Sequence, residues 1–199
     1  MTADRDQVKQ ALDAELNSAA FVDYCPNGLQ VEGRTTISRL VSGVTASQAL
    51  IDRAIELNAD AVLVHHGYFW RGEDPCLVGM KGRRIRTLIQ AEVNLFAYHL
   101  PLDNHATLGN NAGLGRALAM PSWRSLKATD VSYPVFTGQY EKSRSLSDIR
   151  AQLSRCLDRS VVRVGDDSKS ITSVAWCKGG GQSYIDDAAD AGVDLFITG

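Results

Sequence analysis

The sequence lacks several features that would assign it to a whole class of proteins. No run of about 18 or more apolar residues occurs in its 199 positions, which argues against a membrane-spanning helix. Its first residues are polar and lack the apolar core of a secretory signal. The formal net charge is only −2, so there is no basic field to hold nucleic acid and no acidic tail. We therefore expect neither a membrane nor a nucleic acid as partner.

Cysteine is scarce and unpaired in the sequence. The four cysteines lie far apart, at positions 25, 76, 156 and 177, and form no C-x-x-C pair. This spacing argues against a zinc knuckle or a redox dithiol. A chain of this length does not need disulfides for stability, so we expect reduced thiols in a cytoplasmic protein. With 44% hydrophobic and 22% charged residues, the composition indicates one globular domain or two small ones that share a core.

The pattern of apolar residues predicts strands that alternate with helices. Helices are expected at residues 4–16, 47–57, 83–92, 111–120 and from Ser145 onward, and strands near 40–41, 61–64, 93–98, 131–136, 161–164, 173–177 and 194–198. This alternation is typical of an α/β fold with mainly parallel sheets. The stretch at 121–130 has weak periodicity and is the best junction. We therefore predict a first half at 1–125 and a second at 126–199.

The two predicted halves contain an internal echo. Residues 51–54 precede Asp60 by the same spacing at which residues 185–188 precede Asp194, and each aspartate opens an apolar strand. Two related α/β halves would explain this echo, and convergent α/β patterning is the alternative. The last strand of the second half ends at Gly199 with no covering helix. We therefore expect the second half to be incomplete and the chain to be truncated at its C-terminus.

All four histidines of the chain follow two of the predicted strands. His65 and His66 end one strand directly before Gly67, while His99 and Asp103 follow the next strand, with a fourth histidine two residues later. Ligands in open α/β sheets collect outside the carboxyl ends of the strands. At such an end Gly67 allows the backbone to turn, so that both imidazoles of the His65-His66 pair can face one site.

Imidazole nitrogens and a carboxylate oxygen together suit zinc, iron, manganese or nickel. We therefore predict that His65, His66 and Asp103 are metal ligands. A carboxylate between two ions is a device for activating water. The alternative is that adjacent histidines are ordinary surface or core residues. His99 and His105 could each support a ligand from behind or be simple loop residues, and the loop interpretation is favoured for His105. His99 is also a candidate for proton transfer.

Two further motifs have both a functional and a structural interpretation. The glycine-rich segment at 179–183 lies between a strand and a helix, where it could bind an anion or pack its backbone closely. It lacks the spacings of dinucleotide-binding and P-loop motifs. A basic run is interpreted as a solvated helix face, with contact to a phosphate as the alternative; it consists of Lys81, Arg83, Arg84 and Arg86.

Six ordered motifs resemble the GTP cyclohydrolase 1 type 2 homologue family, also called Nif-three-like, and most closely its bacterial YbgI-type branch. They are Tyr-Cys-Pro-Asn-Gly-Leu-Gln-Val at 24–31, Gly-Val-Thr-Ala-Ser at 43–47, His-His-Gly at 65–67, His-Leu-Pro-Leu-Asp at 99–103, Trp-Cys-Lys-Gly-Gly-Gly-Gln-Ser at 176–183 and Phe-Ile-Thr-Gly at 196–199. The resemblance covers essentially the whole chain except residues 121–170, where it is loose.

The resemblance implies a Nif-three-like fold of two α/β halves and a ring-shaped homohexamer whose metal sites face an internal cavity. It also implies two divalent metal ions per subunit in the complete protein. The family's ligands fall on His65, His66 and Asp103 in this sequence. Two more ligands belong to a His-x-x-x-Glu motif near the family's carboxyl terminus, which the resemblance places beyond Gly199.

The leading functional interpretation is a metal-dependent hydrolase that acts on a nucleotide-like substrate, with GTP named by the family resemblance. His99 is the candidate for proton transfer in this interpretation. The alternative is a non-catalytic metal-binding protein or a regulatory ring scaffold. Replacement of Asp103 by alanine should abolish turnover in a hydrolase but leave the partners of a scaffold unchanged. A ring that encloses DNA would need a basic lining, which the net charge of −2 does not support.

Overall fold

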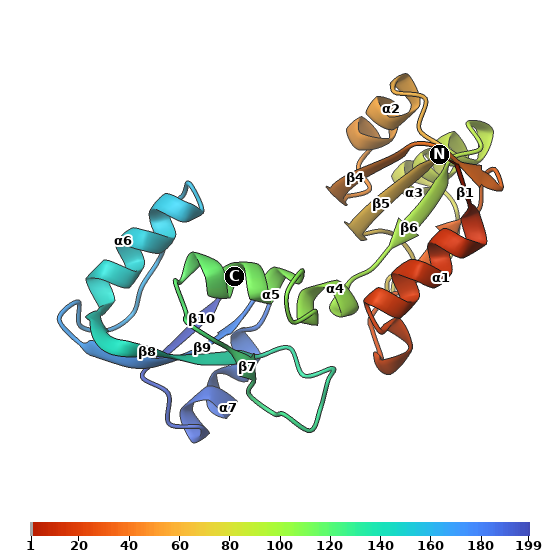
Figure 1. The fold of residues 1–199 in the computed structure, drawn as a ribbon. Coiled ribbons are helices and arrows are strands. Elements are labelled where there is room, and N and C mark those ends of the chain that lie inside the picture. The colour runs from red at the N-terminus through yellow and green to blue at the C-terminus, as the bar shows by residue number, and fades with distance from the viewer. Residues whose placement is uncertain (1) are drawn as a thin grey trace. The chain divides into compact units, whose positions relative to one another are not determined.

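The computed structural model describes residues 2–199, which divide into two compact units (Figure 1). The first unit ends at Leu102, and the second begins at Asp103. The sequence places the division later, between residues 125 and 126. The helix α5 (Asn110–Ala117) accounts for the difference. Its Asn111 carbonyl accepts a hydrogen bond from the buried Trp176 indole, which ties α5 to the sheet of the second unit.

The first unit alternates strands and helices as the sequence predicts. Its elements are β1 (Ala3–Asp4), α1 (Arg5–Glu15), the 3₁₀ helix η1 (Ser18–Ala20), β2 (Gly28–Val31), β3 (Thr36–Ile37), β4 (Leu40–Thr45), α2 (Gln48–Glu56), β5 (Ala61–His66), α3 (Gly79–Gln90) and β6 (Asn94–Ala97). A short helix, α4 (Leu100–Asn104), crosses the division between the units.

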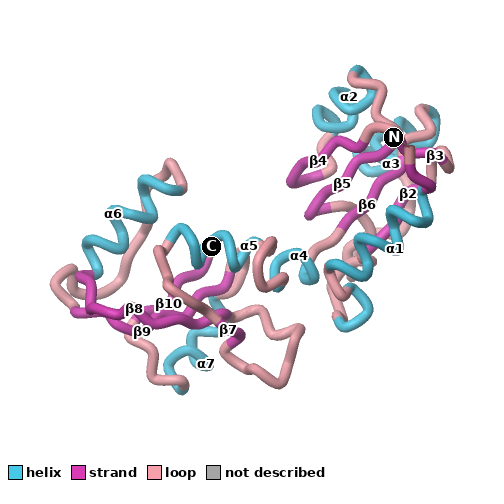
Figure 2. The backbone as a smooth tube through the Cα atoms, in the orientation of Figure 1, coloured by secondary structure: helices cyan, strands magenta, loops and turns pink. Residues whose placement is uncertain are grey.

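The main sheet of the first unit has the order β2-β6-β5-β4, drawn in magenta in Figure 2. Strands β4, β5 and β6 run parallel, and β2 pairs antiparallel to β6. Both faces are covered, because alternate residues of β5 point to opposite sides. Val62 and Val64 pack in one core cluster with α2 and α3, whereas Ala61 belongs to a second cluster with α1. The continuous apolar run of β5 follows from this double burial.

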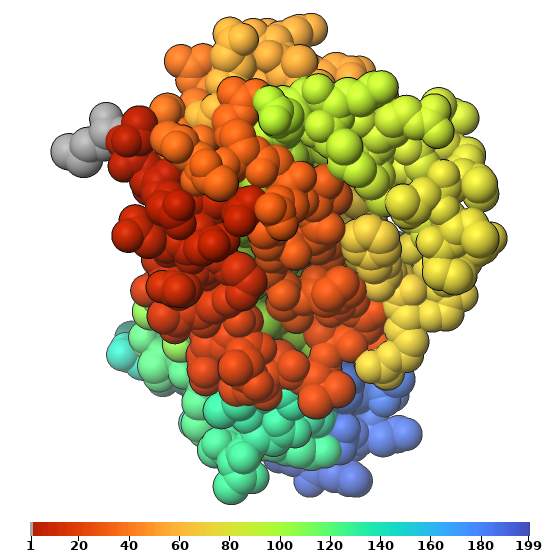
Figure 3. Space-filling model, turned by 90° about the vertical axis from the view of Figure 1, so that its right-hand side faces the viewer, coloured from red at the N-terminus to blue at the C-terminus, as the bar shows by residue number. Residues whose placement is uncertain are grey.

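Side-chain caps define where two of these helices begin. The carboxylate of Asp4 accepts hydrogen bonds from the backbone N–H groups of Asp6 and Gln7 at the start of α1. The Ser47 hydroxyl accepts from the N–H of Leu50 at the start of α2. Helix α1 has no fully buried residue and lies on the surface of the first unit, red in Figure 3.

The second unit has a mixed sheet. After α5 its elements are β7 (Arg124–Ser125), β8 (Phe136–Ser145), α6 (Leu146–Cys156), β9 (Ser170–Cys177), the 3₁₀ helix η2 (Gln182–Tyr184), α7 (Ile185–Asp190) and β10 (Leu195–Thr198). The sheet order is β10-β9-β8-β7, in which β10 and β9 are parallel and the other pairs are antiparallel. The α/β class and the two halves are thus confirmed, and parallel pairing in the second half is limited to one pair.

Two strands predicted for the second unit differ from the structure. Residues 131–135 form a turn and a loop in which Ser132 is bonded to the Asp130 carboxylate, and strand β8 begins only at Phe136. Residues 161–164 belong to no strand, and Val162 is 93% exposed. The three valines of this segment favour a strand, but in the structure the segment pairs with no strand of the β10-β9-β8-β7 sheet. Within residues 2–199, no helix is both long and apolar enough to cross a membrane.

The internal echo of the sequence is also present in the backbone. Strand β4 pairs with β5 so that Leu40 faces Ala61, and β9 pairs with β10 so that Val174 faces Leu195. The same number of residues separates the partners in both pairs. Each half therefore contains a strand, a helix and a parallel strand in the same register.

Candidate metal centre

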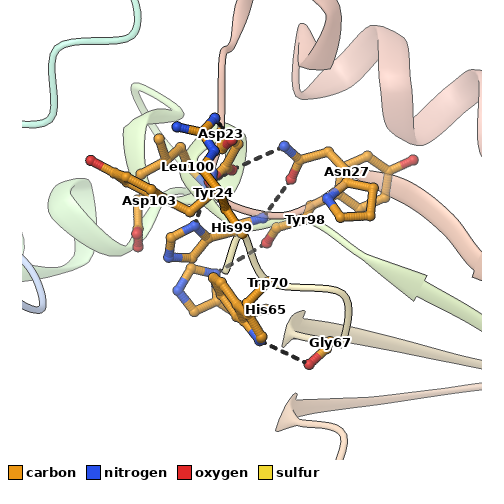
Figure 4. A network of polar contacts seen from close by, with 12 residues as sticks. Asp23, Tyr24, Asn27, His65, Gly67, Trp70, Tyr98, His99, Leu100 and Asp103 are labelled. Atoms are coloured by element: carbon orange, nitrogen blue, oxygen red, sulfur yellow. Dashed lines mark hydrogen bonds and ion pairs between the residues drawn. The ribbon is translucent and has the colours of Figure 1, made fainter. Parts of the chain in front are cut away.

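The carboxyl ends of β5 and β6 bring three histidines together in the first unit, of which Figure 4 labels His65 and His99. His65 and His66 are the last two residues of β5, and His99 follows β6. The ring centroids of His65 and His66 are 4.3 Å apart, and those of His65 and His99 are 5.0 Å apart. One possible ligand atom from each of the three residues lies within 4.8 Å of the others. This grouping follows from parallel strands that end at the same edge of the sheet.

Each of these imidazoles has its Nδ1 atom in contact with another protein group. His65 Nδ1 lies 3.1 Å from the Tyr98 carbonyl, and His99 Nδ1 lies 2.8 Å from Asp23 Oδ1. Because a carbonyl or carboxylate only accepts, both Nδ1 atoms carry a hydrogen, and in the neutral form of either ring the Nε2 atom carries the lone pair. His66 Nδ1 lies 3.1 Å from the Thr45 hydroxyl. Such contacts behind an imidazole orient metal-binding histidines in general.

The carboxylate of Asp23 accepts several hydrogen bonds at this site. Its side chain is 2% exposed and accepts from His99, from the Asn27 amide and from the backbone N–H groups of Tyr24 and Leu100. Burial alone would raise the pKa of Asp23, but these hydrogen bonds outweigh it and lower the pKa below its ordinary value. Asp23 is therefore held as a carboxylate that fixes the ring of His99.

Cys25 forms a second possible ligand group with Asp23 and His99, since one atom of each lies within 4.8 Å of the others. Burial, assisted by the charge of Asp23, raises the pKa of the Cys25 thiol to about 12. The thiolate is the form that binds metal. The imidazole group is therefore the better candidate for an ion.

The loop after the histidine pair is tightly held. A Cβ atom on Gly67 would lie 2.1 Å from Gln30 Oε1, so the loop requires glycine at this position. Gln30 accepts from the Tyr68 N–H at 2.7 Å and donates to the Tyr68 carbonyl at 3.1 Å. The next residue, Phe69, has a φ of 66°, which is rare for a bulky residue. Local strain of this kind collects at functional sites, and the residue after Phe69 is Trp70, whose ring meets that of His99 edge to face.

Asp103, the third predicted ligand, lies in α4 and is 6% exposed. Within the second unit its Oδ1 atom accepts from the Asn110 amide at 2.7 Å and lies 3.9 Å from Lys178 Nζ. Burial, assisted by the charge of Asp103, raises the pKa of the Cys177 thiol to about 11. The role of Asp103 as a metal ligand stays a prediction.

The remaining sequence candidates have structural contacts. His105 Nδ1 accepts from the N–H groups of Thr107 and Leu108 in a turn, consistent with a loop residue. In the glycine-rich loop, Gly181 donates its N–H to the Thr198 hydroxyl, and a Cβ atom there would lie 2.7 Å from Cys177 Sγ. Close backbone packing therefore explains this loop.

The sequence did not single out Asp23 and Cys25 as site residues. Both lie in the loop around residues 23–28, which reads as a turn because of its proline and Asn-Gly pair. The contact of Asp23 with His99 spans more than seventy positions of the chain. The family-like motif at 24–31 is the one signal in the sequence that points to this loop.

Imidazoles at the carboxyl edge of an α/β sheet define a candidate metal-binding protein of that fold class. The chain belongs to the Duf34/NIF3 (NGG1p interacting factor 3) family, whose profile matches residues 3–199. It is 49% identical to the GTP cyclohydrolase 1 type 2 homolog of Pasteurella multocida, over 97% of this chain and 77% of that protein. It is 50% identical to the homolog of Allochromatium vinosum, over 100% of this chain and 77% of that one. The predicted family is thus confirmed.

Solved structures show the same fold. The protein described as "Structural genomics, protein ybgI, unknown function" superimposes with a TM-score of 0.90 at 44% identity, covering 99% of this chain and 78% of that one. The protein TTHA1606 from Thermus thermophilus does so with a TM-score of 0.83 at 32% identity, over 99% and 78% of the two chains.

The residues present fit a divalent metal ion. His65 and His66 are adjacent imidazoles with ring centroids 4.3 Å apart, and the Tyr98 carbonyl and the Thr45 hydroxyl contact their Nδ1 atoms from behind. Nitrogen donors of this kind suit zinc, iron, manganese or nickel, which prefer imidazole to hydroxyl or amide groups.

Proposed function

We propose that the chain is a metal-dependent hydrolase that holds divalent metal through His65, His66 and Asp103 and acts on a nucleotide-like substrate. The histidine cluster at the ends of β5 and β6 is the observation that carries this proposal. The name of the curated relatives, GTP cyclohydrolase 1 type 2 homolog, supports a nucleotide as the substrate class.

Divalent metal bound here would supply a Lewis acid and lower the pKa of a bound water. The side chains of the protein would hold the metal and move the proton. His65 and His66 present nitrogen donors, and Asp103 presents a carboxylate. Asp23 holds the His99 ring in one tautomer, so His99 Nε2 is our candidate atom for moving a proton at the cluster.

The family resemblance extends the proposal to two ions per subunit and to a ring-shaped homohexamer in the cytoplasm. A dinuclear centre would place a second cation near the first and strengthen the activation of water. Native mass spectrometry of the metal-loaded protein measures both the ion count and the number of subunits. A monomer with bound metal would contradict the proposed hexamer but not the proposed metal site.

Metal content tests the proposed ligands. The protein is stripped with a chelator, incubated separately with zinc, manganese, iron or nickel salts, and desalted before elemental analysis. We expect the wild type to retain metal, and His65→Ala and Asp103→Ala to lose most of it. His105→Ala is the matched control, because His105 lies outside the cluster, and should retain the wild-type content. Full retention by both ligand variants would overturn the assignment.

Turnover tests the hydrolase. The metal-loaded wild type should convert GTP, and Asp103→Ala should lose this activity while its circular dichroism spectrum stays unchanged. Tight metal binding in a wild type that converts no purine or pyrimidine nucleotide would instead favour the non-catalytic metal-binding protein.

A further inference from the structure

Two exposed residues, Tyr24 and Arg71, and the half-buried Trp70 form a surface beside the histidine cluster, which we call the Tyr24–Arg71 surface. Trp70 joins this surface to the cluster (Figure 4). Its ring centroid lies 4.9 Å from that of His99, edge to face, and 6.0 Å from that of His66. A ligand that contacts this surface would therefore also reach the histidines.

The Arg71 side chain is held in place by the loop that contains Asp23. Arg71 donates its backbone N–H to the Tyr24 carbonyl at 2.6 Å and a guanidinium N–H to the Asp23 carbonyl at 3.0 Å. The carboxylate of the same Asp23 holds His99 at 2.8 Å. One residue thus bonds both the guanidinium and the imidazole, and this fixes the place of the positive charge relative to the cluster.

The Arg71 guanidinium has N–H donors that are available to a ligand. Arg71 is exposed, and within residues 2–199 no carboxylate forms an ion pair with it. A guanidinium carries five N–H donors in a planar fork, of which the Asp23 carbonyl uses one. This fork matches the paired oxygens of phosphate and carboxylate groups.

The same surface offers an aromatic face. The Tyr24 ring is 54% exposed, and the guanidinium of Arg71 lies 5.7 Å from its centroid. Exposed aromatic rings stack on planar heterocycles, and a neighbouring cation adds to that attraction. A charged fork next to an aromatic ring is the combination that recognises a ligand with both an anionic group and a planar ring.

We propose that the Tyr24–Arg71 surface is the substrate-recognition surface of this site and binds an anionic ligand with a planar ring, the class that contains nucleotides. Arg71 pairs with the anionic group, Tyr24 stacks on the ring, and Trp70 forms the wall toward the histidines. The inference deepens the proposed function, because it assigns recognition of that substrate class to named residues.

Three probes separate the two contacts in calorimetric titrations: GTP, guanosine and tripolyphosphate. They are titrated into metal-free and into zinc-loaded protein. Arg71→Gln should weaken GTP and tripolyphosphate binding by about tenfold or more and leave guanosine binding unchanged. Tyr24→Ala should weaken GTP and guanosine binding by about fivefold or more and spare tripolyphosphate. The matched controls are Tyr24→Phe, which keeps the ring, and Arg86→Gln on the exposed face of α3.

The opposite results overturn the inference. It is wrong if the wild type binds none of the three probes, if Arg71→Gln behaves like Arg86→Gln, or if Tyr24→Ala behaves like Tyr24→Phe. The proposed function fails in a different way. If the hydrolase proposal alone is wrong, the protein holds no metal or shows no turnover, but the metal-free protein still binds the probes in a way that depends on Arg71. If the protein retains metal and turnover but its probe binding does not depend on Arg71, only the proposed recognition surface is wrong.

Discussion

Asp60 and Asp194 make the same pair of hydrogen bonds in the two halves of the chain. Asp60 Oδ2 accepts from the backbone N–H groups of Ser38 at 2.8 Å and Arg39 at 3.0 Å. Asp194 Oδ2 accepts from those of Thr172 and Ser173, both at 2.9 Å. Each carboxylate therefore binds the neighbouring parallel strand directly before the first paired residues, which are Leu40 with Ala61 in one half and Val174 with Leu195 in the other. This contact favours the same register in both halves.

This relationship predicts how stability depends on pH. Burial alone would raise the pKa of Asp60, but its hydrogen bonds with Ser38, Arg39 and Arg34 outweigh burial and lower it. A carboxyl whose folded pKa is lowered stabilises the fold above its unfolded pKa, about 4, and this contribution is lost as the pH falls through the folded pKa. The urea concentration at the unfolding midpoint should therefore decrease as the pH is lowered below about 4.

Asp60→Asn should lower the free energy of unfolding by about 1–3 kcal/mol at pH 7, because one partner of a buried charge-assisted contact is lost. Its difference from the wild type should shrink as the pH falls below about 4, where the wild-type carboxyl is protonated as well. Asp190→Asn, on the exposed end of α7, is the control. A difference that stays constant down to about pH 2 would contradict the assignment.

The Asp23–His99 contact predicts that Asp23→Asn lowers turnover while the metal content stays close to that of the wild type. An asparagine amide can donate to Nδ1, so the His99 ring would no longer be held with its hydrogen on that atom. A positioned group that moves a proton typically contributes about 10²–10⁴-fold to the rate, so most of the turnover should be lost. Conversion of GTP by the metal-loaded protein measures the loss, and nitrogen NMR of His99 reports its tautomer. Unchanged turnover and tautomer would show that Asp23 is structural only.

The loop after β5 predicts that Gly67→Ala destabilises the first unit. The new Cβ atom would lie 2.1 Å from Gln30 Oε1 and 2.7 Å from the Ala97 side chain. Gln30 cannot move away without losing its bonds to Tyr68, so we expect a cost of about 1–3 kcal/mol in urea unfolding. Gly113→Ala in α5, where only the end of the Arg116 side chain lies near, should be neutral or stabilising.

The thiols predict two classes of reactivity. Cys25 and Cys177 are buried, with pKa values raised to about 12 and about 11, whereas Cys76 and Cys156 are exposed. The thiolate is the reactive form, so iodoacetamide at about pH 8 should modify the exposed pair quickly and the buried pair only after unfolding. Peptide mass spectrometry over time identifies each site. Early modification of Cys25 would contradict the burial of this thiol beside the histidine cluster.

The sequence predicted the elements whose signal is local. The apolar run before His65 predicted a strand buried on both faces, and Ser145 with Asp148 predicted the start of α6, where the Ser145 hydroxyl accepts the Asp148 N–H. The predicted ligands were His65, His66 and Asp103, whereas the structure groups His99 with the histidine pair. The strand and the helix start, in contrast, depend on residues close together in the chain.

Other features depend on partners far away in the chain. Strand β8 is largely exposed along its second half, so its polar residues carry no strand pattern of their own, and pairing with β9 decides its extent. The contact of Asp23 with His99 and that of Thr45 with His66 join distant loops, which no spacing in the sequence reveals. The partners of the imidazoles therefore became visible only in the folded chain.

The anchored Nδ1 atoms of the three histidines also bear on how fast a ligand can bind. Tyr98, Thr45 and Asp23 restrict the rings through contacts that the protein makes by itself. The conformational entropy lost by these side chains is consequently lost during folding. An arriving ion meets donors that already face one another, so shedding its own hydration water, and not rearrangement of the protein, is expected to limit the rate of capture.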